Sequence, residues 1–410
     1  MNLDWKKIGV IAMFVAAAGL LAFFLYFFFL RPIARPQPSP DANLVNGELP
    51  PAANLNGPRE FVNINGRLVP VENANVAPPA GPDETARGNI TQTDAITTGP
   101  AYYPSLAGDG SVIYYNAQDG KFYRVTADGQ IEVYDDKVFY NVSNAVWSKN
   151  HDLAVLEYPD GSNIIYDFKN DKQYTLPQHW QEFSFAPDGE RIAFKSMALD
   201  PENRFLAIAR YDSSQIKIIE DIGGSEDKFQ VNFSPNGQMV GDFAEGKDLD
   251  RSEVYFIGEN NENFKSMIVE GRDFQGVWSP DSSRLVYSVY NSKNGYLPEL
   301  WISDASGDNI GNNRQNVYLN TWADKCSFAG SGVVYCAVPQ TLPQGSGLVR
   351  EAAADIADNV YEINLNTGAR RMIAVPSGDH NISQIMTVPG ASYLLFSDSK
   401  TKVIYRLDLQ

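Results

Sequence analysis

From about residue 89 to the C-terminus, short apolar or aromatic runs alternate with turns rich in Asp, Asn, Gly and Pro. Runs of this length, bounded by turn-forming residues, are typical of β-strands. In this region only one insert, within residues 341–357, has a helical pattern. The pattern therefore predicts an all-β domain.

One sequence unit recurs in this domain: an aromatic residue, Ser or Ala, Pro, Asp or Asn, Gly, and then a hydrophobic strand. The clearest copies are FSFAPDGERIAFKS, VNFSPNGQMVGDF and GVWSPDSSRLVYSV, and four others are weaker. Pro fixes φ for a tight turn, and Asp-Gly or Asn-Gly tolerates the positive φ that closes it. Aligned on the position before the Ser or Ala, the copies are anchored at Leu106, Trp147, Phe185, Phe233, Trp278, Phe328 and Thr387.

The spacing of these anchors identifies the architecture. Successive anchors lie 38 to 59 residues apart, and a four-stranded propeller blade takes about 40–50 residues. Four short strands in a radial repeat also leave few exposed sheet edges. We predict a seven-bladed β-propeller over residues 89–410.

The last blade is one strand short. The sequence supplies strands near 382–388, 392–397 and 402–408 before it reaches Gln410. The segment Gly88–Thr98 precedes the first unit and has the Thr and Ile content of a strand. We therefore expect this segment to fill the last blade, so that the two ends of the domain close the ring.

The repeat resembles that of the TolB-like propeller family, whose blades carry an F-S-P-D-G-x-x-I-A-F signature. The resemblance covers about residues 100–410 and is most specific at Phe185, Phe233 and Trp278. It implies a propeller used mainly as a protein-binding platform outside the cytoplasm. TolB itself carries an N-terminal α/β domain that is not evident in this sequence, so its own partners are not transferable.

Residues 8–30 form an unbroken apolar run without charge, preceded by a short tail of residues 1–7. At about 1.5 Å per residue, a helix of this run is about 34 Å long, enough to cross a hydrocarbon core of about 30 Å. A cleavable signal peptide is the alternative, but its apolar region is usually about 7–15 residues long and is followed by small residues. This run ends in FFFLRP, so we predict an uncleaved transmembrane signal-anchor.

The orientation of this anchor is less strongly encoded. Lys6 and Lys7 precede the run and Arg31 and Arg35 follow it, so the count of basic residues is nearly even on the two sides. A single N-terminal anchor before a large acidic domain usually exports that domain. We therefore expect the N-terminus inside and the propeller outside the cytoplasm.

Residues 31–88 are rich in Pro, Asn, Ala and Gly, and no apolar period persists. Pro interrupts both helices and strand ladders. We predict a Pro-rich flexible stalk, with a root-mean-square span of roughly 40 Å for a coil of this length. Within it, Glu60–Val71 alternates enough to predict a short hairpin about Asn65-Gly66.

The strands of a blade run up and down in turn, so equivalent loops emerge on the same face of the ring. We name the four strands A to D, the turn between the first two the A–B turn, and the loop between the second and third the B–C loop. Binding concentrates on loops of a rigid scaffold, and the long loops are mostly of the B–C type. They are expected at Met197–Asn203, Glu245–Ser252, Asn291–Pro298 and Pro339–Asn359.

The longest B–C loop carries a candidate partner-binding stripe. Leu348, Ala352 and Ile356 are spaced four residues apart, which is typical of one face of a short helix. Two interpretations remain open: the stripe packs back on the ring, or it lines a groove for a partner. Tyr296 and Leu297, in the preceding B–C loop, complete the candidate set.

Cys326 and Cys336 flank the sixth hairpin symmetrically about Ser331. If the turn is centred there, the two cysteines face each other across antiparallel strands, where opposed Cα atoms are about 4.5 Å apart, near the lower limit for a disulfide. An exported location would favour oxidation. Two buried free thiols, or a strand register that separates the two cysteines, are the alternatives.

The composition argues against nucleic-acid binding and against a metal site. The chain has 33 Lys and Arg against 50 Asp and Glu, a formal net charge of −17, and such a surface repels phosphate backbones, so no nucleic-acid partner is expected. Three His and two Cys offer little for a metal site, and no metal or other cofactor is expected. No G-x-S-x-G motif occurs, so the sequence shows no nucleophile elbow of a serine hydrolase. His151 stands in an A–B turn, where we expect an exposed residue.

These features together predict a non-catalytic protein-binding scaffold, anchored in the membrane, at the cell envelope. Its partner is expected to be a protein or an envelope component, held near the membrane by a propeller in the periplasm or at the cell surface. Two alternatives remain: a ligand-binding sensor that uses the central channel, and an enzyme of lyase or cyclotransferase type with its site at the channel mouth.

Overall fold

The computed structural model describes residues 20, 61–64, 67–70 and 81–410, which belong to two compact units, Met1–Pro78 and Pro79–Gln410. In the first unit, β1 (Phe61–Ile64) and β2 (Arg67–Pro70) form an antiparallel hairpin with Ile64 opposite Arg67, the position predicted from Asn65-Gly66.

The predicted membrane helix, residues 8–30, lies outside the described residues apart from Leu20, and so does most of the predicted stalk. In the part of the chain that the structure describes, no helix combines the length and the apolar character needed to span a membrane.

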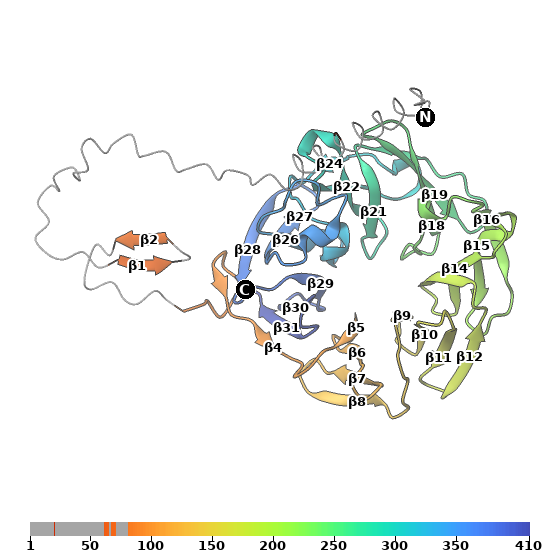
Figure 1. Cartoon of the computed structure of the whole chain (residues 1–410), viewed down its shortest axis with the longest axis horizontal. Helices are drawn as coiled ribbons and strands as arrows, with labels where there is room; N and C mark the ends of the chain where they lie inside the picture. Colours follow the sequence, from red (N-terminus) through yellow and green to blue (C-terminus); the bar gives the residue numbers. More distant parts are fainter. Residues whose placement is uncertain (1–19, 21–60, 65–66, 71–80) are drawn as a thin grey trace, which may run out of the picture. The chain divides into compact units, whose positions relative to one another are not determined.

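Residues 81–410 form a ring of seven antiparallel sheets, which confirms the predicted seven-bladed propeller (Figure 1). In blades 1 to 5 the strands follow the chain outward from strand A at the channel to strand D at the rim, and blades 6 and 7 each add an upstream strand at the outer edge. Blades 1 to 3 consist of β5 (Tyr102–Leu106), β6 (Val112–Asn116), β7 (Lys121–Val125) and β8 (Ile131–Asp135); β9 (Asn144–Trp147), β10 (Leu153–Glu157), β11 (Asn163–Asp167) and β12 (Lys172–Leu176); and β13 (Trp180–Phe185), β14 (Arg191–Met197), β15 (Arg204–Arg210) and β16 (Lys217–Asp221).

Blades 4 to 7 continue the same order around the ring. Blades 4 and 5 consist of β17 (Phe229–Val231), β18 (Met239–Gly246), β19 (Ser252–Gly258) and β20 (Met267–Val269), and of β21 (Arg272–Trp278), β22 (Arg284–Tyr290), β23 (Pro298–Asp304) and β24 (Gln315–Asn316). Blades 6 and 7 consist of β25 (Cys326–Ala329), β26 (Val333–Pro339), β27 (Asp358–Asn364) and β28 (Arg370–Pro376), and of β29 (Ile382–Thr387), β30 (Tyr393–Asp398) and β31 (Ile404–Asp408).

The hydrophobic core is divided among the interfaces between blades. Within residues 81–410 the buried apolar side chains form seven clusters, and each cluster joins two neighbouring blades. Ile113 and Tyr115 of blade 1, for example, pack against Ala154 and Leu156 of blade 2. A single sheet exposes two faces, so each blade buries its apolar residues only between two neighbours. The closed ring is therefore the unit of stability.

The segment before blade 1 closes the ring, as predicted. Strand β4 (Asp94–Ala95) pairs with the outer edge of β31, with Ala95 opposite Tyr405, and supplies the fourth strand of blade 7. The structure adds a contact that the sequence did not predict: β3 (Ile90–Thr91) pairs in parallel with β28 as a fifth strand of blade 6. One upstream segment thus fastens two blades.

Short 3₁₀ helices occupy the connections, and one of them replaces the expected helical stretch. They are η2 (Pro201–Asn203), η3 (Glu226–Lys228), η4 (Ser292–Asn294), η5 (Gly307–Asn309), η6 (Ala323–Lys325) and η7 (Arg350–Ala353). Leu348 lies in the turn before η7. The N–H groups of Gly345 and Gly347 bond to a neighbouring loop, so they do not build a helix, and the four-residue spacing does not form one continuous helical face.

Candidate functional site

The long B–C loops lie where the sequence predicted them, between β14 and β15, β18 and β19, β22 and β23, and β26 and β27. Because successive strands of each blade alternate in direction, these loops all leave the ring on one face. We call this the B–C face. The D–A connections between blades lie on the same face.

The candidate residues of the last two B–C loops lie in adjoining segments. The N–H of Gly345 donates to the carbonyl of Gly295 at 2.8 Å, and the N–H of Gly347 donates to the carbonyl of Tyr296 at 2.8 Å. Tyr296 and Leu297 are half-buried. In the longest loop, Leu348 and Ala352 are exposed and Ile356 is half-buried, so the first two do not pack back on the ring.

The longest loop is held firmly although its apolar residues face solvent. The Arg350 guanidinium binds the Asp324 carboxylate through two hydrogen bonds of 2.8 and 3.1 Å and lies 4.8 Å from the ring centroid of Trp322. The side-chain amide of Asn381 donates to two carbonyls of the loop, at Ala353 and Ile356. Such fixed geometry lowers the entropy that a loop loses when it binds.

Two further apolar residues on the B–C face were not singled out from the sequence. Leu199, between β14 and β15, is 98% exposed, and Leu249, between β18 and β19, is 74% exposed. Leu348 and Val349 are 56% and 55% exposed. The available signal was an isolated Leu within a polar loop, such as LDPEN, but periodicity cannot tell whether such a residue points inward or outward.

Cys326 and Cys336 lie opposite each other on β25 and β26. Their sulfur atoms are bonded at 2.08 Å, with the Cα atoms 4.1 Å apart. Both residues are buried in the cluster between blades 5 and 6, so the bond is part of the core between these two blades.

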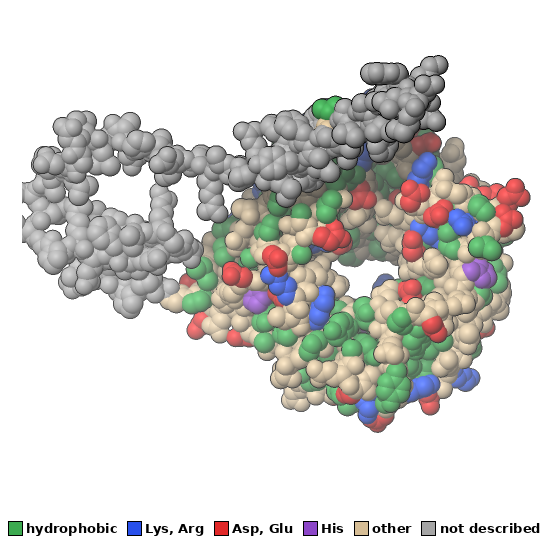
Figure 2. Space-filling model, viewed as in Figure 1, with side chains coloured by type: hydrophobic (Ala, Val, Ile, Leu, Met, Phe, Trp, Pro, Cys, Tyr) green, Lys and Arg blue, Asp and Glu red, His purple; other side chains and the backbone are tan. Residues whose placement is uncertain are grey.

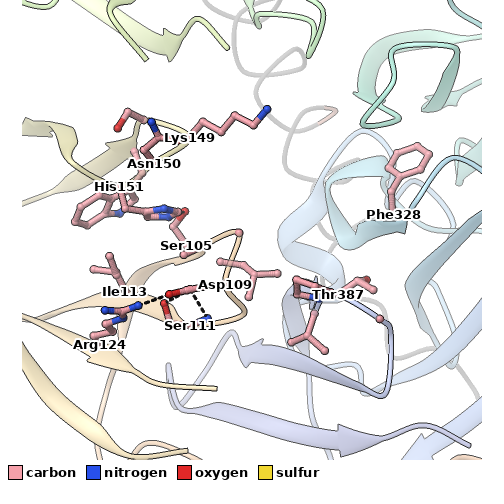
Figure 3. A pocket seen from close by; sticks show the side chains of 18 of the residues that line it. Ser105, Asp109, Ser111, Ile113, Arg124, Lys149, Asn150, His151, Phe328 and Thr387 are labelled. Atoms are coloured by element: carbon pink, nitrogen blue, oxygen red, sulfur yellow. Dashed lines mark hydrogen bonds and ion pairs between the residues drawn. The ribbon is translucent and has the colours of Figure 1, made fainter. Parts of the chain in front are cut away.

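A large pocket opens on the opposite face, at the A–B end of the channel (Figure 3). The A–B turns of blades 1, 2, 6 and 7 surround it, and its volume is about 1080 Å³. Figure 3 shows side chains converging from separate blades, with Lys149 reaching toward the open space and Phe328 standing across from it. Figure 2 shows the opening at the centre of the ring. The loops that the sequence predicts to bind a partner lie on the other face, the B–C face.

The burial of His151 differs from the prediction. It was expected to be an exposed turn residue, but it is only 4% exposed, because its ring packs on Trp147 at a centroid distance of 5.5 Å. Burial lowers the pKa of His151, so the imidazole is neutral near pH 7. Its Nε2 lies 2.8 Å from the hydroxyl oxygen of Ser105, while its Nδ1 has no hydrogen-bond partner among the described residues.

A second polar group lines the pocket next to this pair. The Arg124 guanidinium donates to Asp109, whose carboxylate also accepts from the hydroxyl of Ser111 at 2.6 Å. These hydrogen bonds to the charged form hold the pKa of Asp109 below its usual value. The pocket therefore offers a fixed hydroxyl beside a paired cation and anion, an arrangement suited to hydrogen bonding a polar ligand. Its one hint in the sequence was a His at a position where several other A–B turns have Gly, as at Gly189 and Gly237.

The described part of the chain shows no cluster of metal-ligating side chains. No group of three or more His, Cys, Asp or Glu side chains is placed there to hold a metal ion.

Comparisons with known proteins show the fold alone. The β-propeller domain of Cps50 (Swd1) from Myceliophteria thermophila is similar at a TM-score of 0.51 and 11% identity, over 78% of this chain and all of that one. A chain of the mitotic checkpoint complex is similar at a TM-score of 0.51 and 10% identity, over 85% of this chain and all of that one. An oligogalacturonate lyase from Vibrio parahaemolyticus reaches a TM-score of 0.48 at 12% identity, over 78% and 93% of the two chains.

No family model and no curated protein matches the chain. The resemblance to TolB-like propellers therefore stays a prediction, while the propeller fold is shared with solved structures.

Proposed function

We propose that this chain is a membrane-anchored, extracytoplasmic scaffold that binds a protein partner on the B–C face without catalysing a reaction. One observation carries the proposal: the B–C loops of three blades present large apolar side chains to solvent, Leu199, Leu249, Leu348 and Val349. Apolar residues gathered on one face of a soluble domain mark interaction sites more often than isolated ones do.

The energetics favour a protein surface as the partner. Burying one exposed Leu or Val contributes about 1.5–3 kcal/mol, so several such contacts sustain an interface once the cost of association is met. Leu348 and Val349 sit on a loop fixed by Arg350 and Asn381, so little ordering is required of it. Membrane anchoring and export rest on the apolar run at residues 8–30.

The test uses the full chain in its native host, with a photo-crosslinking residue in place of Ala352. The variant Leu199→Ser/Leu249→Ser/Leu348→Ser should lose the captured partner. The control is Ile216→Ser/Ile218→Ser, because these side chains are similarly exposed, 57% and 54%, but belong to the rim strand β16 and its approach.

The two variants separate the possible outcomes. Loss of capture in the B–C variant, with capture retained in the control and equal melting temperatures, supports the proposal. An unchanged set of crosslinked proteins removes the B–C face from the interface. Deleting residues 341–357 is a poorer test, because it strips the side-chain amide of Asn381 of both its acceptors.

Location and catalysis are tested separately. A reporter fused after Gln410 should be active only outside the cytoplasm, and cytoplasmic activity would reverse the proposed orientation. A fluorophosphonate probe should leave Ser105 unlabelled, since no carboxylate among the described residues accepts a hydrogen bond from the Nδ1 of His151 to orient the imidazole. Labelling of Ser105 would show a reactive serine and contradict the non-catalytic role.

A further inference from the structure

The pocket at the A–B end of the channel is independent of the B–C face and has the size of a ligand site. Its volume of about 1080 Å³ is just above the range of about 300–1,000 Å³ for small-molecule pockets. Four blades contribute to its wall, so its shape depends on the closed ring. A site of this kind accommodates a ligand of two or three small rings.

The charges of the wall exclude a simple ion as the favoured ligand. Arg124 and Lys149 line the pocket together with Asp109 and Asp152, so the ionisable side chains sum to zero in a chain whose net charge is −17. An anion would be attracted by the two basic side chains and repelled by the two carboxylates, and a cation would experience the reverse. A purely apolar ligand would desolvate these groups without offering them partners.

The remaining features of the wall combine apolar surface with hydrogen-bonding groups. Trp147 and Phe328 are half-buried and come from blades 2 and 6, and Figure 3 shows Phe328 across the pocket from the blade 2 turn. The same pocket is lined by the Ser105 hydroxyl, held 2.8 Å from His151, and by the Asn150 side chain. These groups donate and accept hydrogen bonds in the same wall.

We propose that this pocket binds a neutral saccharide of two or three rings. Each sugar hydroxyl both donates and accepts, so it matches a wall that carries both signs of charge, with Arg124 paired to Asp109 and Lys149 reaching toward the open space. The C–H faces of the sugar ring pack on the aromatic and apolar side chains. Recognition needs no rearrangement of the turns, because backbone bonds such as His151 N–H to Ser148 O, at 2.9 Å, already fix them.

The test measures saccharide binding to the full chain, purified in a detergent without a sugar headgroup. An array of neutral and acidic glycans identifies the ligand, and isothermal titration then measures its affinity. We expect a neutral glycan to bind with one site per chain. The variant Lys149→Ala/Asn150→Ala should weaken binding at least about tenfold, because both residues are exposed at the A–B turn of blade 2 and line the pocket.

The matched control is Lys169→Ala, an exposed lysine in another turn of the same blade that does not line the pocket. It should bind the glycan as the unaltered chain does, and the melting temperatures of all three proteins should agree. The proposal is overturned if no neutral glycan binds at concentrations up to about 10 mM. It is also overturned if citrate or spermidine binds in preference, or if the pocket variant and the control bind equally.

Discussion

Replacing Lys325 with Met tests a buried ion pair between the connection that enters blade 6 and the third strand of that blade. The Lys325 ammonium lies 2.7 and 2.8 Å from the two carboxylate oxygens of Asp358, and both side chains are buried. One of these oxygens also accepts the backbone N–H of Ile382 at 2.6 Å, at the start of blade 7. Burial raises the pKa of Asp358 and lowers that of Lys325, so each charge depends on the other.

The magnitude follows from leaving a buried charge without its partner. Removing one member of a buried pair costs about 3–5 kcal/mol, whereas replacing both members by neutral groups is often close to neutral. Lys325→Met should therefore lower the free energy of unfolding by about 3–5 kcal/mol. Lys325→Met/Asp358→Asn should recover most of that loss, because no charge remains and the amide oxygen of Asn still accepts the N–H of Ile382.

The assay is urea unfolding at pH 7, followed by tryptophan fluorescence, on both variants and on Lys169→Met. That exposed control should stay within about 0.5 kcal/mol of the unaltered chain. A loss below about 1 kcal/mol in Lys325→Met, or a double variant as unstable as the single one, would refute the reasoning.

Three further changes test other parts of the ring. Burial raises the pKa of Asp242 to about 7, above its unfolded value of about 3.9. The folded chain therefore keeps Asp242 protonated at pH values where the unfolded chain has released the proton, and the free energy of unfolding should fall as the pH rises from about 4 to 7. Asp242→Asn should be more stable than the unaltered chain at pH 8 by up to about 4 kcal/mol. Equal melting temperatures at that pH would contradict this. Reducing Cys326–Cys336, or replacing both with Ser, should cost about 3 kcal/mol by loop entropy, measured by denaturant unfolding with and without reductant. Gly241→Ala would place a Cβ 2.3 Å from the carbonyl oxygen of Gln230, so the variant should melt well below the unaltered chain, and an unchanged melt would contradict the strand geometry.

Short sequence patterns were enough to predict most of the propeller fold. The Pro-Asp-Gly turns and the flanking apolar runs are encoded within about 14 residues, as in GVWSPDSSRLVYSV, so blade number, the order of the strands and the positions of the B–C loops were predictable. Ring closure by the segment before blade 1 was predictable by counting strands. The membrane helix and the stalk stay predictions, since residues 8–30 and most of 31–78 lie outside the described part of the chain.

The sequence did not predict which A–B turns surround the pocket or which polar residues are buried. Ser105 and Thr387 line one pocket although nearly the whole propeller separates them in the chain, and His151 is buried because Trp147 covers it.

The sequence by itself determined the repeating blade, because turn chemistry and alternation act over a few neighbouring residues. The tertiary structure alone decided the parallel strand β3, the buried pair Lys325–Asp358 and the channel-mouth pocket. The parallel strand and the pocket depend on how different blades pack together, and the ion pair joins residues 33 positions apart in the chain, so no run of a few neighbouring residues contains any of the three.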